Sequence, residues 1–292
     1  MKLSYTGRKS ITGYIFVSPW IIGSVVLLIF PLVFSLILSV VKLENVDFSN
    51  MSFVGIEHYK RAFTVDMEYL PLFWTMVSDT LINTPMIVIS SLIIAIMLSR
   101  NIKGRGFFRL VFFLPVLLGA GYIMQQVLGQ KVDQEATKLA RGILLPDAVQ
   151  EYLGVGFTNA VMAFFDRITI VLWKSGVQII IALAGIQGIS SSLYESARVD
   201  GAMEWEMFWK ITLPMISPIL LLNTVYTLIS SLTESGNMID FITGKIFGQS
   251  SLLEYEYSSA LGWIYFIFIL FLVLLVFLIM KPFTKNVAEN DK

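Results

Sequence analysis

The most informative stretch of this chain is Glu195 to Pro214, ESARVDGAMEWEMFWKITLP. It is a charged, helix-forming interlude between two long apolar runs, and charged chain between membrane spans must face water. Leu193 and Ala197 stand one helical turn apart, and Gly201 then interrupts the pattern, because glycine readily takes a positive φ. The stretch therefore predicts a helix, a sharp turn and a second helix.

The second helix of this hairpin has two neighbouring apolar stripes. Glu206 and Lys210 are spaced as an i,i+4 ion pair, and Glu195 and Arg198 as an i,i+3 pair. Pro214 is expected to close the helix and, with Pro218, to mark the entry to the next span. The alternative to a protein contact is an amphipathic hairpin on lipid headgroups. The stripes are Met203, Met207 and Ile211, and beside them Trp205, Phe208 and Trp209.

Composition places the rest of the chain in a membrane. The 292 residues are 56% hydrophobic and 14% charged, with no net charge, and a soluble domain of this size could not hide so much apolar surface. Apolar runs of about 20 residues cross the hydrocarbon, and these runs are too long for barrel strands. We expect a single all-α transmembrane domain over residues 1–292. Its six spans are expected near residues 11–41, 80–99, 107–128, 168–189, 215–232 and 258–280.

Several classes of function are disfavoured by what the sequence contains. There is no cysteine and only one histidine, His58, which argues against thiolate and most histidine-based metal or catalytic sites. Basic residues are scattered near span ends, so nucleic acid is not an expected partner. Acids cluster in loops and no inverted repeat is visible, which disfavours an ion-coupled secondary transporter. A membrane enzyme lacks paired carboxylates at a common depth, and a structural scaffold stays open as a third alternative.

Charge asymmetry sets the expected topology. The N-terminal segment, residues 100–109 and the C-terminal tail are basic, whereas residues 41–79 and 234–257 are rich in acids. Lys and Arg in short loops mark the cytoplasm. Six spans with both termini cytoplasmic satisfy this pattern and place the hairpin, residues 193–214, in the cytoplasm between spans four and five.

The hairpin carries a resemblance to a known family. Its residues Glu195-Ser196-Ala197, Asp200-Gly201-Ala202, Phe208 and Leu213-Pro214 resemble the EAA signature of membrane (permease) subunits of binding-protein-dependent ABC importers. Ser196 departs from the usual alanine. FVGIEHYKRAF (53–63), RGFFRLVFFLP (105–115), ALAGIQGIS (182–190) and GYIFVSPWIIG (13–23) are similar to the maltose-permease-like, carbohydrate-uptake branch. The match fades over residues 131–157.

The resemblance implies a type I importer permease fold whose hairpin is a coupling helix. It implies Glu195 as the anion offered to an ATPase, Gly201 as the turn, Ala197 and Ala202 as close-contact surface, and bracing of the hairpin by Phe208, Leu213 and Pro214. No GxxxxGK[ST] loop occurs in the chain, so ATP and Mg are expected on partner subunits and no cofactor here. The implied partners are a second, homologous permease, two cytoplasmic ATPases, an extracytoplasmic solute-binding protein and the lipid of a bacterial or archaeal cytoplasmic membrane.

The implied cargo is a carbohydrate, with an oligosaccharide favoured and glycerol-phosphate or polyamines as alternatives. Polar groups near membrane depth are candidates for the translocation pathway, although each could instead form a helix-to-helix hydrogen bond. Lys174 is a charge well inside a span, but its long side chain could extend to the interface. The pathway candidates are Asn83, Gln125, Gln126, Lys174, Gln178, Asn223, Tyr226 and Thr227.

Overall fold

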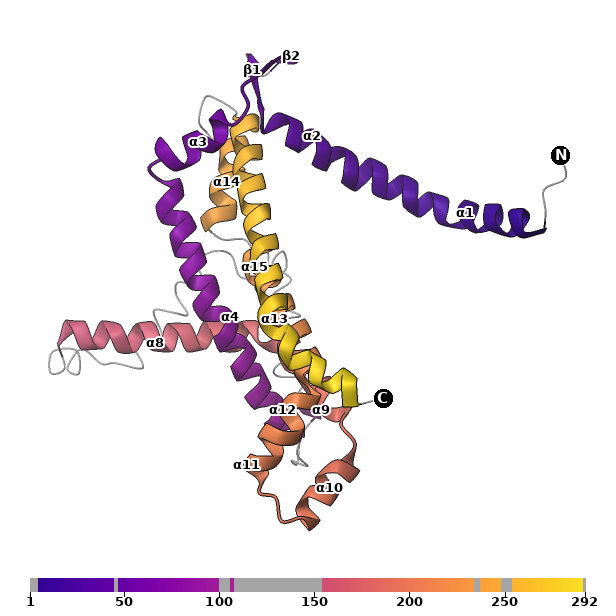
Figure 1. Ribbon diagram of the computed structural model, residues 1–292. Helices are drawn as coiled ribbons and strands as arrows, with labels where there is room; N and C mark the ends of the chain where they lie inside the picture. Colours follow the sequence, from indigo (N-terminus) through magenta and orange to yellow (C-terminus); the bar gives the residue numbers. More distant parts are fainter. Residues whose placement is uncertain are drawn as a thin grey trace. The chain divides into compact units, whose positions relative to one another are not determined.

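Helices dominate the structure, which is a computed structural model (Figure 1). It describes residues 5–44, 47–99, 106–107, 154–233, 237–247 and 254–290. The chain forms two compact units, which are unit 1 (residues 1–77 and 233–271) and unit 2 (residues 78–232 and 272–292). Two long helices, α4 (Tyr69–Ser99) and α15 (Tyr255–Asn290), supply residues to both. Each unit therefore joins segments that are far apart in the sequence.

Long apolar helices confirm a helical membrane fold. Within the described residues, Gly13–Leu38, Tyr69–Ser99 and Tyr255–Phe283 are each long and apolar enough to cross a membrane. Two bent helix pairs qualify only as broken spans, with bends of 63° and 68°, so the count is three, or up to five. The span expected at residues 107–128 lies almost wholly outside the described residues. Six spans therefore remain a prediction.

The first span is shorter than predicted, and a small β-hairpin follows it in unit 1. α1 (Tyr5–Ser24), a π turn η1 (Val25–Ile29) and α2 (Phe30–Leu38) run consecutively, so the helix ends at Leu38 rather than near residue 41. β1 (Val41–Glu44) then pairs antiparallel with β2 (Asp47–Phe53). Val41 and Leu43 are buried on either side of exposed Lys42, and this period of two favours a strand. The fold is therefore not purely α.

The core of unit 1 gathers around two buried tyrosines. α3 (Glu57–Thr64), the start of α4, α14 (Asn237–Phe247) and the start of α15 meet there. Tyr69 and Tyr257 are fully buried with Ala62, Met238 and Leu261. This packing explains why α4 begins at Tyr69 and not at the predicted Thr80. Its first two turns are stabilised by contacts in the core of unit 1, whereas the prediction used only the apolar run that starts near residue 80.

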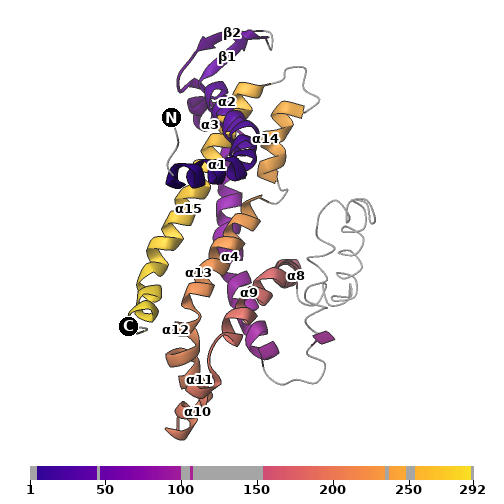
Figure 2. The same ribbon diagram turned by 90° about the vertical axis from the view of Figure 1, so that its right-hand side faces the viewer.

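Unit 2 packs α9 (Gly176–Gln187) and α13 (Ser217–Thr233) against α4, as Figure 2 shows. Ala95 and Leu98 of α4 contact Ile179 and Leu183 of α9. Leu92 contacts Ile216 and Leu220 at the start of α13. The buried positions of α4 recur every three or four residues, so one face of this helix carries the contact.

The predicted fourth span, residues 168–189, is broken. α8 (Val155–Lys174) ends before Ser175, and α9 begins at Gly176. The Ser175 hydroxyl donates to the carbonyl of Val171, and such back-bonding bends helices. A following glycine weakens the helix further. The fifth and sixth spans, expected at 215–232 and 258–280, correspond to α13 and to the central part of α15.

Candidate functional site

The predicted helix, turn and helix are present at residues 191–215. α10 (Ser191–Val199) is capped at its start by Ser190, whose hydroxyl accepts from the Ser192 N–H at 3.4 Å. The return limb comprises α11 (Glu204–Met207), a π turn η2 (Phe208–Thr212) and α12 (Leu213–Met215). In Figure 1 the two limbs form the hairpin labelled α10 and α11.

The turn of the hairpin explains the run Asp200-Gly201-Ala202. The Ala202 N–H donates to the Ala197 carbonyl at 2.9 Å, and the Gly201 N–H donates to the Arg198 carbonyl at 3.1 Å. This pair of bonds is a Schellman motif, which requires a left-handed residue at its centre. Gly201 supplies it with φ of 82°. The small residues therefore set the sharp reversal of the chain.

The charged residues of the hairpin pair differently from one expectation. Glu206 accepts the Met203 N–H at 3.1 Å and lies 3.7 Å from Lys210, as the i,i+4 spacing predicts. Arg198 pairs with Glu204 at 3.5 Å across the turn and not with Glu195, because the Schellman turn brings the start of α11 back beside it. The side chains of Arg198 and Glu204 are both mostly exposed, so their pair contributes little to stability.

Glu195 is exposed, and its carboxylate has no hydrogen-bond or ion-pair partner among the described residues. Large apolar side chains surround the same turn without cover. Val199 is 87% exposed, Met203 73% and Trp205 69%. A free carboxylate beside exposed apolar groups is typical of a surface that another molecule covers. Ser196 is also exposed, whereas Ala197 and Ala202 are half-buried.

The base of the hairpin is packed into unit 2. Phe208 and Leu213 contact the cluster formed by Leu92, Ile216 and Leu220. Phe208 and Leu213 therefore pack the base of the hairpin against other residues of its own unit, and their role in bracing it during transport stays a prediction. Pro214 does not close the second helix as predicted.

The helix continues through Pro214 to Met215, and the chain bends at Ile216. Proline clashes with the carbonyl four residues earlier in a regular α-helix, here that of Lys210. The π turn η2 contains Lys210, and its wider i→i+5 bonding removes this conflict. The same arrangement recurs in the first span, where η1 ends two residues before Pro31.

A buried polar seam joins α4, α9 and α13 in unit 2. The side-chain amide of Asn223 donates to the Ser91 hydroxyl at 3.4 Å and to the Gln178 backbone carbonyl at 3.3 Å. Ser90 and Ser175 contact each other at 3.4 Å. The side-chain carbonyls of Gln178 and Asn223 are buried, and among the described residues they have no hydrogen-bond partner. Unpaired buried acceptors are costly unless another group or water reaches them.

The pathway candidates that lie within the described residues fall into three groups. Gln178 and Asn223 meet in the seam, and Thr227 is buried one turn along α13, where its hydroxyl donates to the Asn223 carbonyl at 2.7 Å. Asn83 lies on α4, and its buried side-chain oxygen has no hydrogen-bond partner in the part of the chain that the structure describes. Tyr226 is 38% exposed and Lys174 half-buried at the end of α8. Gln125 and Gln126 lie outside the described residues.

The sequence reasoning missed three members of the seam, Ser90, Ser91 and Ser175. Small hydroxyls in apolar helices bond to the preceding turn and so resemble apolar residues in a sequence pattern. Only for Ser91 does its position give a signal, because Ser91 falls on the same buried face of α4 as Thr84 and Ala95.

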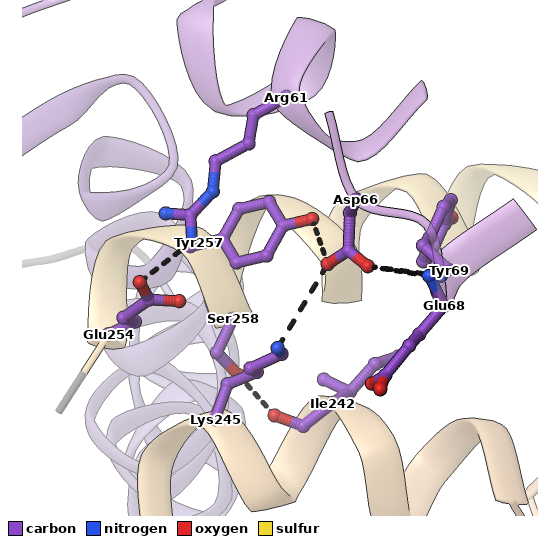
Figure 3. Close-up of polar contacts among 9 residues, drawn as sticks. All are labelled: Arg61, Asp66, Glu68, Tyr69, Ile242, Lys245, Glu254, Tyr257 and Ser258. Atoms are coloured by element: carbon purple, nitrogen blue, oxygen red, sulfur yellow. Dashed lines mark hydrogen bonds and ion pairs between the residues drawn. The ribbon is translucent and has the colours of Figure 1, made fainter. Parts of the chain in front are cut away.

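A charged cluster in unit 1 was also missed (Figure 3). Asp66 accepts the N–H groups of Glu68 and Tyr69 at 3.0 and 3.2 Å, and the Tyr257 hydroxyl donates to it at 2.8 Å. Lys245 lies 4.0 Å from the same carboxylate. Burial by itself would raise the pKa of Asp66, but the donors from Tyr257, Glu68 and Tyr69 and the charge of Lys245 together lower it.

The other half of this cluster holds an arginine against α15. Arg61 donates to Glu254 at 2.8 Å and stacks over the Tyr257 ring, with the guanidinium 4.2 Å from the ring centre. Figure 3 shows that Tyr257 lies between the two ion pairs. The cluster therefore ties α3 and the start of α4 to α14 and α15 within unit 1.

Comparisons with known proteins show that this chain is similar to membrane components of transport systems. Residues 68–288 match the family model described as the binding-protein-dependent transport system inner membrane component. The probable ABC transporter permease protein YesP of Bacillus subtilis is 31% identical over 232 residues, which cover 79% of this chain and 74% of YesP. The trehalose/maltose transport system permease protein MalF of Thermococcus litoralis is 27% identical, covering 88% and 85% of the two chains.

A solved structure shares the fold. A chain from the crystal structure of a bacterial alginate ABC transporter, in complex with an alginate pentasaccharide-bound periplasmic protein, superposes with a TM-score of 0.63 at 18% identity. The superposition covers 95% of this chain and 96% of that one. The family match spans most of the sequence, and the protein therefore belongs to the family of inner-membrane components of binding-protein-dependent transport systems.

Proposed function

We propose that this chain is the transmembrane subunit of an ATP-driven importer that translocates a carbohydrate, and specifically an oligosaccharide. Two relatives support this cargo by their names, the arabinooligosaccharides transport system permease protein AraP of Halalkalibacterium halodurans and the lactose transport system permease protein LacF of Rhizobium radiobacter. A glycerol-phosphate or polyamine cargo is the alternative. The external solute-binding protein selects the cargo in this proposal, and the permease conducts it.

The observation that carries the proposal is the hairpin of residues 191–215. Glu195 has a free, exposed carboxylate, and the tip at Val199, Met203 and Trp205 is apolar and uncovered. An ATPase with a basic and apolar cleft fits this surface better than lipid does, because the carboxylate would face anionic headgroups. Burying Val199 and Trp205 in such a cleft would remove the unfavourable exposure of both.

The coupling mechanism follows from this contact. Two ATPase subunits close around ATP and Mg and draw the hairpins of two homologous permeases together. Phe208 and Leu213 pack against Leu92, Ile216 and Leu220, so motion of the hairpin is passed to α13 and α4. The chain itself hydrolyses nothing, since it is the membrane component and its sequence has no nucleotide-binding loop.

In the proposed orientation the hairpin and both termini lie in the cytoplasm of a bacterial or archaeal cell. The acid-rich segments 41–79 and 234–257 then lie outside, on the side of the solute-binding protein. The buried seam within unit 2 contains the side-chain carbonyls of Gln178 and Asn223, which have no hydrogen-bond partner among the described residues and suit the hydroxyl donors of a sugar. The pathway is proposed to pass along this seam.

Uptake by proteoliposomes tests the proposal. The assembled transporter is reconstituted with its solute-binding protein outside and ATP inside, and labelled maltose, trehalose, lactose and arabinotriose serve as probes. We expect uptake of at least one probe that needs internal ATP and survives collapse of proton and sodium gradients. Uptake that ignores ATP and stops with the ion gradient would instead support a secondary transporter.

A further inference from the structure

The π turn η2 in the return limb of the hairpin leaves a carbonyl that a hydroxyl reaches. Thr212 is buried, and its hydroxyl lies 3.4 Å from the Met207 carbonyl, five residues earlier. The C-terminal end of the turn shows the same i→i+5 spacing, since the Leu213 N–H donates to the Phe208 carbonyl. π turns inside α-helices frequently mark functional positions.

The same hydroxyl connects this turn to the other limb. The Tyr194 hydroxyl lies 2.8 Å from the Thr212 hydroxyl. Thr212 has one proton to donate, and the Met207 carbonyl can only accept. Thr212 therefore makes both bonds at once only when Tyr194 donates to Thr212 and Thr212 donates to the Met207 carbonyl.

This relay crosses the hairpin near its base, where the limbs are half-buried or buried. The contact between Arg198 and Glu204 crosses it at the tip, but both side chains are mostly exposed there. A buried hydrogen bond holds a geometry better than an exposed ion pair, because water does not compete for it. Leu213, which directly follows Thr212, packs against the cluster of Leu92, Ile216 and Leu220.

We propose that Tyr194 and Thr212 are positioning residues that fix the angle between α10 and the return limb, so that force applied at the tip reaches α13. This proposal rests on the proposed coupling function. Glu195, the expected contact for an ATPase, follows Tyr194 directly in α10. A loose angle would let the tip move without moving the helix at its base.

Spin labels test the angle without requiring transport. The chain has no cysteine, so Val199→Cys and Leu222→Cys place one label on the tip and one on exposed α13. In the assembled transporter we expect a narrow distance distribution that Tyr194→Phe and Thr212→Val each broaden at least twofold. The double variant should broaden it no more than either one, and Thr212→Ser should restore the narrow distribution. Unchanged widths in both single variants would overturn the proposal.

ATP-driven uptake of the same labelled sugars supplies the second readout. Tyr194→Phe and Thr212→Val are expected to lower sugar imported per ATP hydrolysed by about threefold to tenfold, the size of effect that one buried hydrogen bond gives. Thr224→Val is the control, since among the described residues the Thr224 hydroxyl bonds only to the Leu220 carbonyl of its own helix. Loss of ATPase from the purified complex, or no rescue by Thr212→Ser, would contradict the positioning role. Absence of ATP-driven uptake by the unmodified transporter would contradict the proposed function instead.

Discussion

Gly201 is the residue whose identity is fixed most clearly by backbone geometry. Its φ of 82° is left-handed, and nothing lies within 4 Å of a Cβ built there, so a side chain would meet strain but no clash. Such strain costs roughly 1–2 kcal/mol for most residues and less for asparagine. We expect Gly201→Val to lower ATP-coupled uptake more than Gly201→Asn does, with both variants inserted normally. Equal uptake by the two variants would show that the turn conformation is not needed.

The charge of the Glu195 carboxylate can be tested with a single substitution. Its carboxylate makes no bond to the described residues, so Glu195→Gln should leave the unfolding temperature unchanged. It should lower sugar uptake per ATP at least tenfold if the charge contacts basic groups of an ATPase. Glu204→Gln is the matched control on the same hairpin, because Glu204 pairs with Arg198 at an exposed site. A Glu195→Gln transporter with normal coupling would remove this residue from the contact.

The residue scale also shows what a sequence can predict. Asp200-Gly201 predicted a sharp turn because glycine readily takes the positive φ that such a turn needs. The two Schellman hydrogen bonds form around this glycine. The partner of Arg198 could not be read in this way, since it depends on how far the turn brings α11 back. The effect of Pro214 was misjudged for a related reason, because a π turn is a tertiary accommodation without a clear sequence signal.

At the scale of elements, Gly185 allows α9 and α13 to approach closely. A Cβ at Gly185 would lie 2.9 Å from Cγ2 of Ile219. Gly185→Val should therefore destabilise unit 2 by about 1–3 kcal/mol through overpacking. Adding Ile219→Ala should recover part of the loss, so the two changes will not be additive.

Thermal unfolding in detergent measures this contact. Gly244→Val in α14 is the control, because no described residue lies within 4 Å of a Cβ added there. We expect a clear fall in the unfolding temperature for Gly185→Val and a small change for Gly244→Val. Equal falls for the two would attribute the effect to helix propensity and not to packing.

The charged cluster of unit 1 makes a prediction about pH. Hydrogen bonds and Lys245 lower the pKa of Asp66 below its ordinary value of 3.8, although burial opposes them. The unfolded chain then binds its proton first as pH falls, so the stabilisation by Asp66 is complete above about pH 4 and is lost as pH falls through the lower folded value. Asp66→Asn keeps a capping side chain but removes the charge.

Unfolding temperatures at pH 7 and near pH 3 test this assignment. We expect Asp66→Asn to unfold earlier than the unmodified chain at pH 7 and the difference to shrink near pH 3. Asp66→Ala should be the least stable of the three at pH 7, because it also loses the cap on Glu68 and Tyr69, worth about 1 kcal/mol. A difference that stays constant with pH would mean that the charge of Asp66 contributes nothing.

At the scale of the whole molecule, the sequence predicted the class of protein better than its internal organisation. Apolar runs of membrane length and the motif at residues 195–214 were sufficient for a helical membrane fold and for the family. The two compact units were not visible, since each joins distant segments through tertiary contacts, such as that of Tyr69 with Phe241 in unit 1. The break at Ser175 was hidden because apolar runs, residues 170–173 and 179–184, continue on both sides of it.

The hairpin of residues 191–215 is proposed to be the contact between this membrane subunit and a separate ATPase. A single cysteine at Val199, which is 87% exposed, can carry a photoactivatable crosslinker in a chain that has no other cysteine. Ile89→Cys on the exposed face of α4 is the control. In the assembled transporter we expect the probe at Val199 to crosslink to the ATPase. The probe at Ile89 should give no crosslink to the ATPase. Crosslinks from Val199 to lipid alone would contradict it.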